Sequence, residues 1–211
     1  IKEEHMSTTE TGILKKIQGL LQNAETDPRN YALVVLGLNT ALRISDILNL
    51  TYDMVYHKGE VRTHIVVKER KTGKSNHILL NQEIRKALKS YHSYLISSSA
   101  HRVGNIYLFP SPRNKDGFVP LSGAYHIIQA ITQAVPIEGH ISCHSLRKTF
   151  GYHAWKQGAD PVVIMLIYNH SSFSITKRYL CIEQDDKDDY TERYFCKNNI
   201  TAQHYCYGLL W

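Results

Sequence analysis

The sequence lacks the features that mark membrane-spanning, secreted and zinc-stabilised proteins. Its 211 residues contain no uninterrupted apolar run of the ~18 residues that a membrane-spanning helix needs. The four cysteines form no CxxC pair, and neither they nor the 12 histidines have the spacing of zinc ligands. Residues 1–6 are polar, do not resemble a signal peptide and end in Met6, which makes them a possible expression remnant. We therefore expect a soluble, cytoplasmic protein without a structural metal or a disulfide scaffold.

Charge is unevenly distributed along the chain. The formal net charge is +6, but residues 181–192 contain six acidic side chains and one lysine, a local net charge of −5. The rest of the chain therefore carries +11. A surplus of this size favours a polyanionic partner, because neutralising phosphates releases counterions. An ordinary basic surface is the alternative interpretation of the same composition.

Helical periodicity dominates the sequence. Asp27 followed by Pro28 gives an N-cap and a first-turn proline, and Ser45 and Asn81 are further candidate caps. The apolar band after Pro28 marks its helix as the central one. Capping signals and apolar spacing together predict helices over residues 9–23, 28–38, 46–50, 82–96, 122–134, 144–158 and 161–169.

Residues 54–80 have a different pattern, typical of strands. Their β-branched and apolar residues are separated by two turn signals, Lys58-Gly59 and Thr72-Gly73. Two hairpins of this kind predict one small antiparallel sheet of three strands. The predicted fold class is therefore mixed, mainly α with a small three-stranded antiparallel β-sheet.

Two arginines from separate segments, Arg43 and Arg147, are candidates to bind a phosphodiester. A guanidinium group matches phosphate oxygens with paired, charge-assisted hydrogen bonds. His144 precedes Arg147 by three residues and so shares its helical face, and His170 could donate to a non-bridging oxygen. Taken singly, each of these residues is better explained as a helix cap, a helix-end residue or a solvated side chain.

Tyr179 follows His170 by nine residues and is the candidate nucleophile. A phenol with a pKa of ~10 is a weak nucleophile unless positive groups stabilise the phenolate. The arginine and histidine cluster would supply that stabilisation. Because the chain has 14 tyrosines, only its position in this cluster distinguishes Tyr179 from the others.

Lys71 lies at the second predicted turn, beside Gly73. A lysine on such a turn could donate a proton to the departing 5′ oxygen of a cleaved strand. The neighbouring basic residues Lys68, Arg70 and Lys74 are the alternatives for this role.

Four segments together resemble the tyrosine recombinase (phage integrase) family. They are TALRISDILNL (40–50), KTGK (71–74), HSLR (144–147) and HSSFSITKRYL (170–180). The resemblance covers roughly residues 9–182, includes all six signature positions in order and is greatest to integrases of phages and mobile elements. It implies the family's catalytic-domain fold and DNA cleavage through a 3′-phosphotyrosine intermediate, with no metal and no nucleotide cofactor.

The resemblance also implies a role for each signature residue. Tyr179 would be the nucleophile, Lys71 the general acid, and His144 the proton acceptor from the tyrosine. The residues that would bind and activate the phosphate are Arg43, His144, Arg147 and His170.

Three positions depart from the family pattern. Ala41 stands where the family usually has Gly, Asp46 where Glu is common, and Tyr168-Asn169 where Leu-Gly usually precedes the histidine. None of these changes removes a catalytic side chain. Asn169 could nevertheless alter the turn that positions His170.

The resemblance divides the chain into a catalytic domain at 7–182 and a C-terminal extension at 183–211. The resemblance implies that the extension packs on a neighbouring protomer, and a disordered or non-native tail is the alternative. It also implies that the family's separate N-terminal DNA-binding domain is missing. The expected partner is double-stranded DNA, on which the protomers would form dimers or tetramers. The alternatives are an Xer-type recombinase, a type IB topoisomerase-like enzyme, or a DNA-binding module of the same fold without catalysis.

Overall fold

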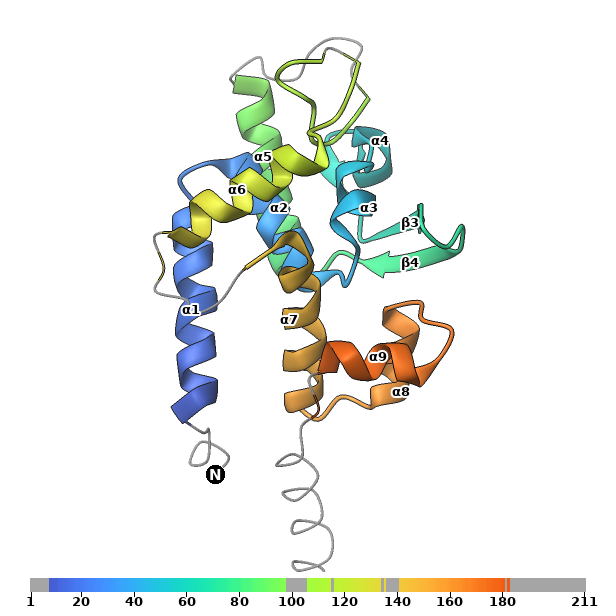
Figure 1. The fold of residues 1–211 in the computed structure, drawn as a ribbon. Coiled ribbons are helices and arrows are strands. Elements are labelled where there is room, and N and C mark those ends of the chain that lie inside the picture. The colour runs from blue at the N-terminus through green and yellow to red at the C-terminus, as the bar shows by residue number, and fades with distance from the viewer. Residues whose placement is uncertain are drawn as a thin grey trace, which may run out of the picture.

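The computed structural model describes residues 8–97, 106–114, 116–133, 135, 141–180 and 182, with side chains from residue 15 onward (Figure 1). The predicted expression remnant and C-terminal extension lie outside the described residues. Along the chain the elements are α1 (Thr8–Ala24), α2 (Pro28–Asn39), α3 (Ile44–Leu48), α4 (Tyr52–Val55), β1 (Tyr56–His57), β2 (Glu60–Val61), β3 (His64–Lys68), β4 (Ser75–Leu79), α5 (Gln82–Ser97), α6 (Leu121–Gln133), α7 (Cys143–Lys156), α8 (Pro161–Ile167) and α9 (Phe173–Leu180).

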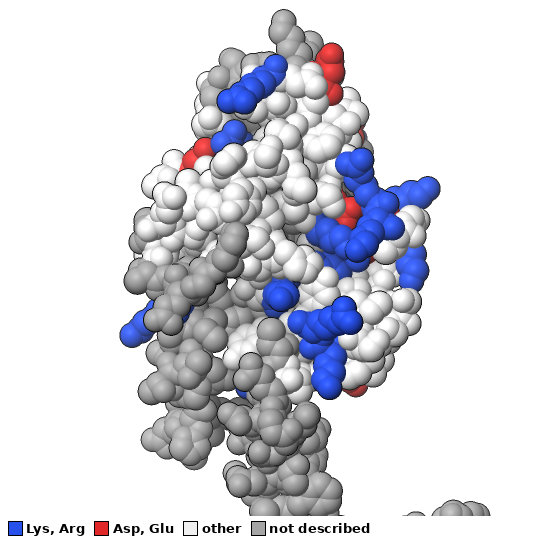
Figure 2. Space-filling view, in the orientation of Figure 1, with Lys and Arg blue, Asp and Glu red and all other residues white. Residues whose placement is uncertain are grey.

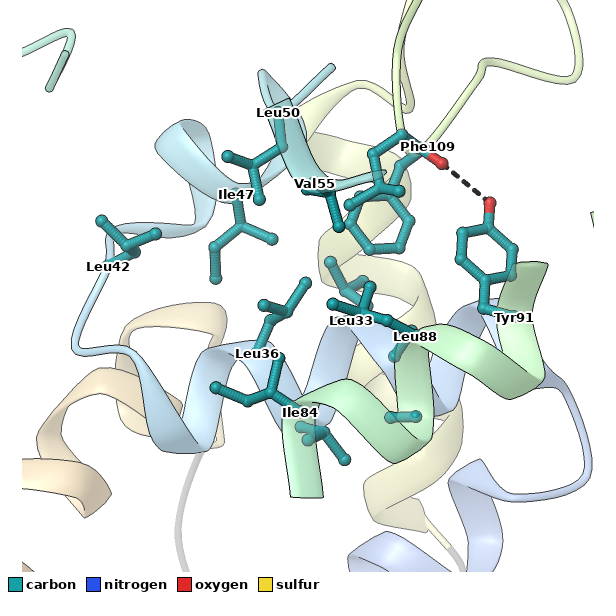
Figure 3. Packing of buried hydrophobic residues seen from close by; sticks show 14 of the residues in the cluster. Leu33, Leu36, Leu42, Ile47, Leu50, Val55, Ile84, Leu88, Tyr91 and Phe109 are labelled. Carbon is teal, nitrogen blue, oxygen red and sulfur yellow. Dashed lines mark hydrogen bonds between the residues drawn. The ribbon is translucent and has the colours of Figure 1, made fainter. Parts of the chain in front are cut away.

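Helix α2 is the central helix, as its apolar band predicts. Its N-terminus is capped by Asp27, whose carboxylate accepts from the backbone N–H groups of Arg29 and Asn30. The helix packs against α1, α5 and α7. Figure 3 shows Leu33 and Leu36 of α2 facing the apolar side chains of α5 and of the segment that follows α2. This core is the platform on which the site-bearing segments rest.

The strands form two separate antiparallel pairs in the described residues, so the prediction of one three-stranded sheet is wrong. β1 pairs with β2, and β3 pairs with β4. The chain changes partner between β2 and β3: the N–H of Arg62 donates to the carbonyl of Val55, whereas the carbonyl of Thr63 accepts from Leu80. The central predicted strand is therefore divided in two.

Two local expectations also differ from the structure. Arg43, not Ser45, occupies the N-cap position of α3, and it makes no side-chain capping bond. Met54 and Val55, expected in a strand, belong to the one-turn helix α4. A helix this short has no apolar period, which leaves the β-propensity of its residues as the dominant local signal.

Helices α7, α8 and α9 pack together beside the β3–β4 hairpin (Figure 1). Ser142 and Ser145 form a capping box that begins α7, one residue before the predicted start at His144. Asp160 accepts from the N–H of Val162 and begins α8 as predicted. Of the helices in the described part of the chain, none has the length and apolar character that crossing a membrane requires.

Candidate active site

All six residues singled out from the sequence line one pocket of about 490 Å³. They come from six places in the chain: the start of α3, the β3–β4 turn, the first turn of α7, its second turn, the end of α8 and the end of α9. Figure 2 shows lysine and arginine side chains gathered on the side of the molecule that carries β3, β4 and α9. The six residues are Arg43, Lys71, His144, Arg147, His170 and Tyr179.

Arg147 is held rigidly at the back of this pocket, where only 2% of the residue is exposed. One of its terminal nitrogens, Nη1, donates to the carbonyl oxygen of Ala41. The other, Nη2, donates to the carbonyl oxygen of Tyr168 at 3.1 Å and to Nε2 of His170 at 3.1 Å. The guanidinium thus joins the segment before α3 to the end of α8, two parts that are far apart in sequence.

The partners of His170 determine its tautomer. A guanidinium group only donates, so Nε2 of His170 accepts from Arg147 and carries no proton. Nδ1 therefore carries the proton and donates to Oγ1 of Thr176 at 3.0 Å. Burial, reinforced by the charges of Arg147 and Arg43, lowers the pKa of His170 to about 4. His170 is neutral at pH 7 and acts here as a support for Arg147.

The turn before His170 ends α8 in a Schellman motif. The N–H of His170 bonds to the carbonyl of Met165, and the N–H of Asn169 bonds to that of Leu166. The motif requires a left-handed residue, and Asn169 has a φ of 57°. Asparagine is the non-glycine residue best suited to this conformation. The departure from glycine therefore leaves His170 positioned by an ordinary helix end.

Tyr179 projects from the last turn of α9 into the cluster of aromatic and cationic groups. Its ring centroid lies 5.2 Å from that of His144, 5.0 Å from that of His170 and 4.9 Å from that of Tyr168. The Cζ atom of Arg147 lies 5.5 Å from the same ring. The ring is half-buried. These contacts hold the phenol beside two imidazoles and a guanidinium.

His144 faces the pocket from the first turn of α7. Partial burial, together with the positive charges of Arg147, Lys148, Arg43 and Lys71, lowers the pKa of His144. The imidazole is therefore predominantly neutral at pH 7 and has a lone pair with which to accept a proton. Such a neutral base next to a tyrosine suits general base catalysis.

Arg43 and Lys71 also line the pocket. Nη1 of Arg43 lies 2.5 Å from Oε2 of Glu69, a carboxylate with no exposed surface. Lys71 is exposed in the turn that joins β3 to β4, where Gly73 has a φ of 68°. A solvated lysine on a turn can approach a bound ligand from the open side of the pocket.

Glu69 and Tyr168 contact the predicted site residues, and sequence reasoning assigned a role to neither. The position of Glu69 could have been predicted from the alternating pattern of the strand. Ile65 and Val67 point inward from β3, so a period of two places the acidic Glu69 on the same buried face. A carboxylate at an inward strand position needs a partner, and here the partner is Arg43.

The fold and this site agree with the match of the chain to a protein family. A model described as the phage integrase family matches residues 14–185. The chain belongs to this family, whose members are tyrosine recombinases.

Known relatives support the same assignment. The chain is 36% identical over 173 residues to the probable integrase/recombinase YoeC of Bacillus subtilis, covering 82% of this chain and 88% of YoeC. Curated relatives named XerC and XerD also match, and the chain spans about half of their length.

Two solved structures share the fold. The crystal structure of XerA recombinase has a TM-score of 0.72 and 24% identity, covering 91% of this chain and 65% of that one. The XerH recombinase, bound to a palindromic difH substrate in a post-cleavage complex, has a TM-score of 0.68 and 18% identity. That match covers 89% of this chain and 52% of XerH.

Proposed function

We propose that this chain cleaves and rejoins DNA strands through a 3′-phosphotyrosine intermediate, as the catalytic domain of a site-specific recombinase or integrase. The catalytic domain in this proposal comprises residues 7–182. The observation that carries it is the arrangement of Tyr179, whose ring packs against His144 and His170 in a pocket that also contains two arginines and a lysine.

In the proposed cleavage step, the phenol oxygen of Tyr179 attacks the phosphorus of a phosphodiester. The bond from phosphorus to the 5′ oxygen breaks as the bond from Tyr179 to phosphorus forms. His144 accepts the phenol proton, and Lys71 donates a proton to the leaving 5′ oxygen. Arg43 and Arg147 bind the non-bridging oxygens, where negative charge increases in the transition state.

His170 contributes to phosphate binding in this scheme by holding the guanidinium of Arg147. Rejoining is the same step in reverse, with a 5′ hydroxyl as the attacking group. The phosphotyrosine bond conserves the energy of the broken phosphodiester, so the scheme uses no metal ion and no nucleotide.

The proposed partner is double-stranded DNA, in the cytoplasm. The XerH complex supports this choice, because it shows a related fold of a site-specific recombinase bound to its difH substrate. Exchange between two duplexes breaks four strands, and each protomer supplies one Tyr179. We therefore propose that dimers assemble into tetramers on paired sites. The relatives named XerC and XerD favour, as a second candidate, an Xer-type role with the same chemistry.

Incubation with a nicked suicide duplex tests the proposal. Loss of a short 5′ fragment traps the covalent intermediate, which denaturing electrophoresis detects. We expect an adduct in the presence of an excess of chelator. If the protein binds the duplex and forms no adduct, the chain is a DNA-binding module without catalysis. An adduct that disappears with the chelator would contradict the metal-free scheme.

A further inference from the structure

A buried carboxylate lies directly behind the cationic wall of the pocket. Among the described residues that line this pocket, Arg43, Lys71, Lys74 and Arg147 are cationic, and none is acidic. Glu69 stands behind them with a fully buried side chain. A site that attracts phosphate gains nothing in affinity from a nearby carboxylate, so Glu69 requires another explanation.

The contacts of Glu69 connect the two sides of this wall. Oε2 accepts from Nη1 of Arg43 at 2.5 Å and from Oγ1 of Thr72 at 3.0 Å. The backbone of Glu69 bonds to Gly73 and Lys74, which closes the turn. The Glu69 carboxylate therefore joins the start of α3 to the turn that carries the candidate general acid. Asp46 of α3 lies near the same two segments, since its Oδ2 is 3.9 Å from Nη1 of Arg43 and its Oδ1 accepts from the N–H of Arg70.

A second set of contacts extends from Glu69 to the helix end that positions His170. Nδ2 of Asn76 lies 3.4 Å from Oε1 of Glu69 and donates to the carbonyl of Ile167 at 3.2 Å. Nδ2 of Asn169 lies 3.5 Å from the carbonyl oxygen of Ser75. The β3–β4 hairpin is thus fastened to α3 on one side and to the end of α8 on the other.

The negative charge of Glu69 affects the two arginines of the pocket before DNA binds. The positive charge of Arg43 adds to the effect of burial in lowering the pKa of Arg147, whereas Glu69 opposes it. Burial raises the pKa of Glu69, but hydrogen bonds from Arg43 and Thr72 outweigh burial and leave it below its usual value. Glu69 is therefore ionised at neutral pH and offsets the repulsion between the two arginines.

We infer that Glu69 is a positioning residue that takes the place of the phosphate in the DNA-free protein, holding Arg43 and the Lys71 turn ready for the substrate. Its carboxylate binds one terminal nitrogen of Arg43 and leaves the rest of the guanidinium for a phosphate oxygen. This inference rests on the proposed function for its kinetic consequence, but not for its effect on stability.

Glu69→Gln tests the inference, because glutamine keeps the shape and the acceptor oxygen but removes the charge. In sodium chloride, we expect Glu69→Gln to unfold at a lower temperature than the wild type. In inorganic phosphate at equal ionic strength, this difference in unfolding temperature should be smaller, since phosphate can replace the lost anion. Glu60→Gln is the matched control, because Glu60 is exposed on the neighbouring hairpin. It should behave as the wild type in both salts. An equal deficit of Glu69→Gln in both salts would mean that Glu69 has only a packing role.

Cleavage of the suicide duplex provides the kinetic test. At saturating protein, Glu69→Gln should slow adduct formation about tenfold, the effect expected for loss of a charged hydrogen bond. In an Arg43→Ala background the same change should have less than about twofold further effect, because Glu69 acts through Arg43. Additive losses, or wild-type cleavage by Glu69→Gln, would overturn the inference.

Two further outcomes distinguish the role of Glu69 from the proposed function of the chain. Glu69→Asp keeps the charge, so it should fold without added phosphate even if Glu69→Gln does not. If Glu69→Asp is no more stable than Glu69→Gln, the inference is contradicted. If wild-type protein forms no adduct, the proposed function fails, and the comparison of phosphate with chloride still decides the role of Glu69.

Discussion

The ring of Tyr168 fills the space that the absence of a side chain on Gly151 leaves open. A Cβ atom at position 151 would lie 2.8 Å from Cε2 and 3.0 Å from Cζ of Tyr168. The ring is fully buried, and its hydroxyl donates to the carbonyl of Arg147. It also stacks on His170 at a centroid distance of 4.9 Å and an angle of 5°. The pair therefore supports the side of the site that carries Arg147 and His170.

Gly151→Ala should destabilise the protein although alanine is the better helix former. The propensity gain is about 1 kcal/mol, whereas overpacking costs about 1–3 kcal/mol, so we expect a net loss of up to about 2 kcal/mol. Urea unfolding measures this loss. In a Tyr168→Leu background the alanine has room, and the same substitution should then be neutral or stabilising. Equal losses in both backgrounds would show that the ring is not what excludes a side chain.

Asn169→Val should damage the site more than Asn169→Gly does. The left-handed conformation costs an ordinary residue about 1–2 kcal/mol and a β-branched residue more. Valine should therefore displace the turn and slow cleavage along with its loss of stability. Glycine adopts this conformation without strain and loses only the contact of the Asn169 side chain with Ser75, so Asn169→Gly should cleave faster than Asn169→Val. The two variants are compared by single-turnover cleavage, and equal rates would contradict the role given to this turn.

The folded protein should lose stability as the pH falls from about 6.5 to 4. In this window an unfolded chain protonates His170, whereas the folded chain, with a pKa of about 4, leaves it neutral. The unfolded state therefore binds more protons, and the free energy of unfolding decreases toward acid. In His170→Gln this slope should fall by up to about 1.4 kcal/mol per pH unit. Urea unfolding across this range measures it, and an unchanged slope would refute the buried neutral imidazole.

Lys71→Ala should slow cleavage by about 10²–10⁴-fold, the usual contribution of a general acid. The loss should be much smaller when the leaving 5′ oxygen is replaced by sulfur, because a thiolate leaves without a proton. Lys68→Ala is the control, since Lys68 is an exposed lysine of β3 outside the pocket lining. Equal losses on the oxygen and sulfur substrates would remove Lys71 from this role.

The sequence predicts most of the elements that carry the site, because short-range signals begin them. Asp160 and the proline after it begin α8, and Asn81 accepts from the N–H of Ile84 at the start of α5. The six residues of the site could be chosen for the same reason, since each lies in a short motif with its own pattern. That the six residues share one pocket is a property of the fold. It could be expected from the sequence only through the resemblance to a family.

The remaining features depend on contacts between distant segments. Arg43 and Glu69 are 26 positions apart, and only the packing of the hairpin on α3 brings them together. The predicted sheet is divided because the backbone N–H of Arg62 donates to the carbonyl of Val55. No local sequence pattern specifies this partner. Ser45 is not the cap because α3 begins at Ile44, two residues before the predicted start, with Arg43 in an extended conformation before it. Tertiary packing overrides local preference in each of these cases.

Mapping the covalent adduct on the protein is the most direct test of the central claim. The adduct formed on the suicide duplex is digested, and mass spectrometry locates the residue that carries the 3′-phosphate. We predict that it lies on Tyr179 and that Tyr179→Phe forms no adduct while still binding the duplex. Tyr125→Phe is the control, since Tyr125 is an exposed tyrosine of α6 outside the pocket lining, and it should form the adduct normally. An adduct that persists in Tyr179→Phe, or that maps to another residue, would contradict the account.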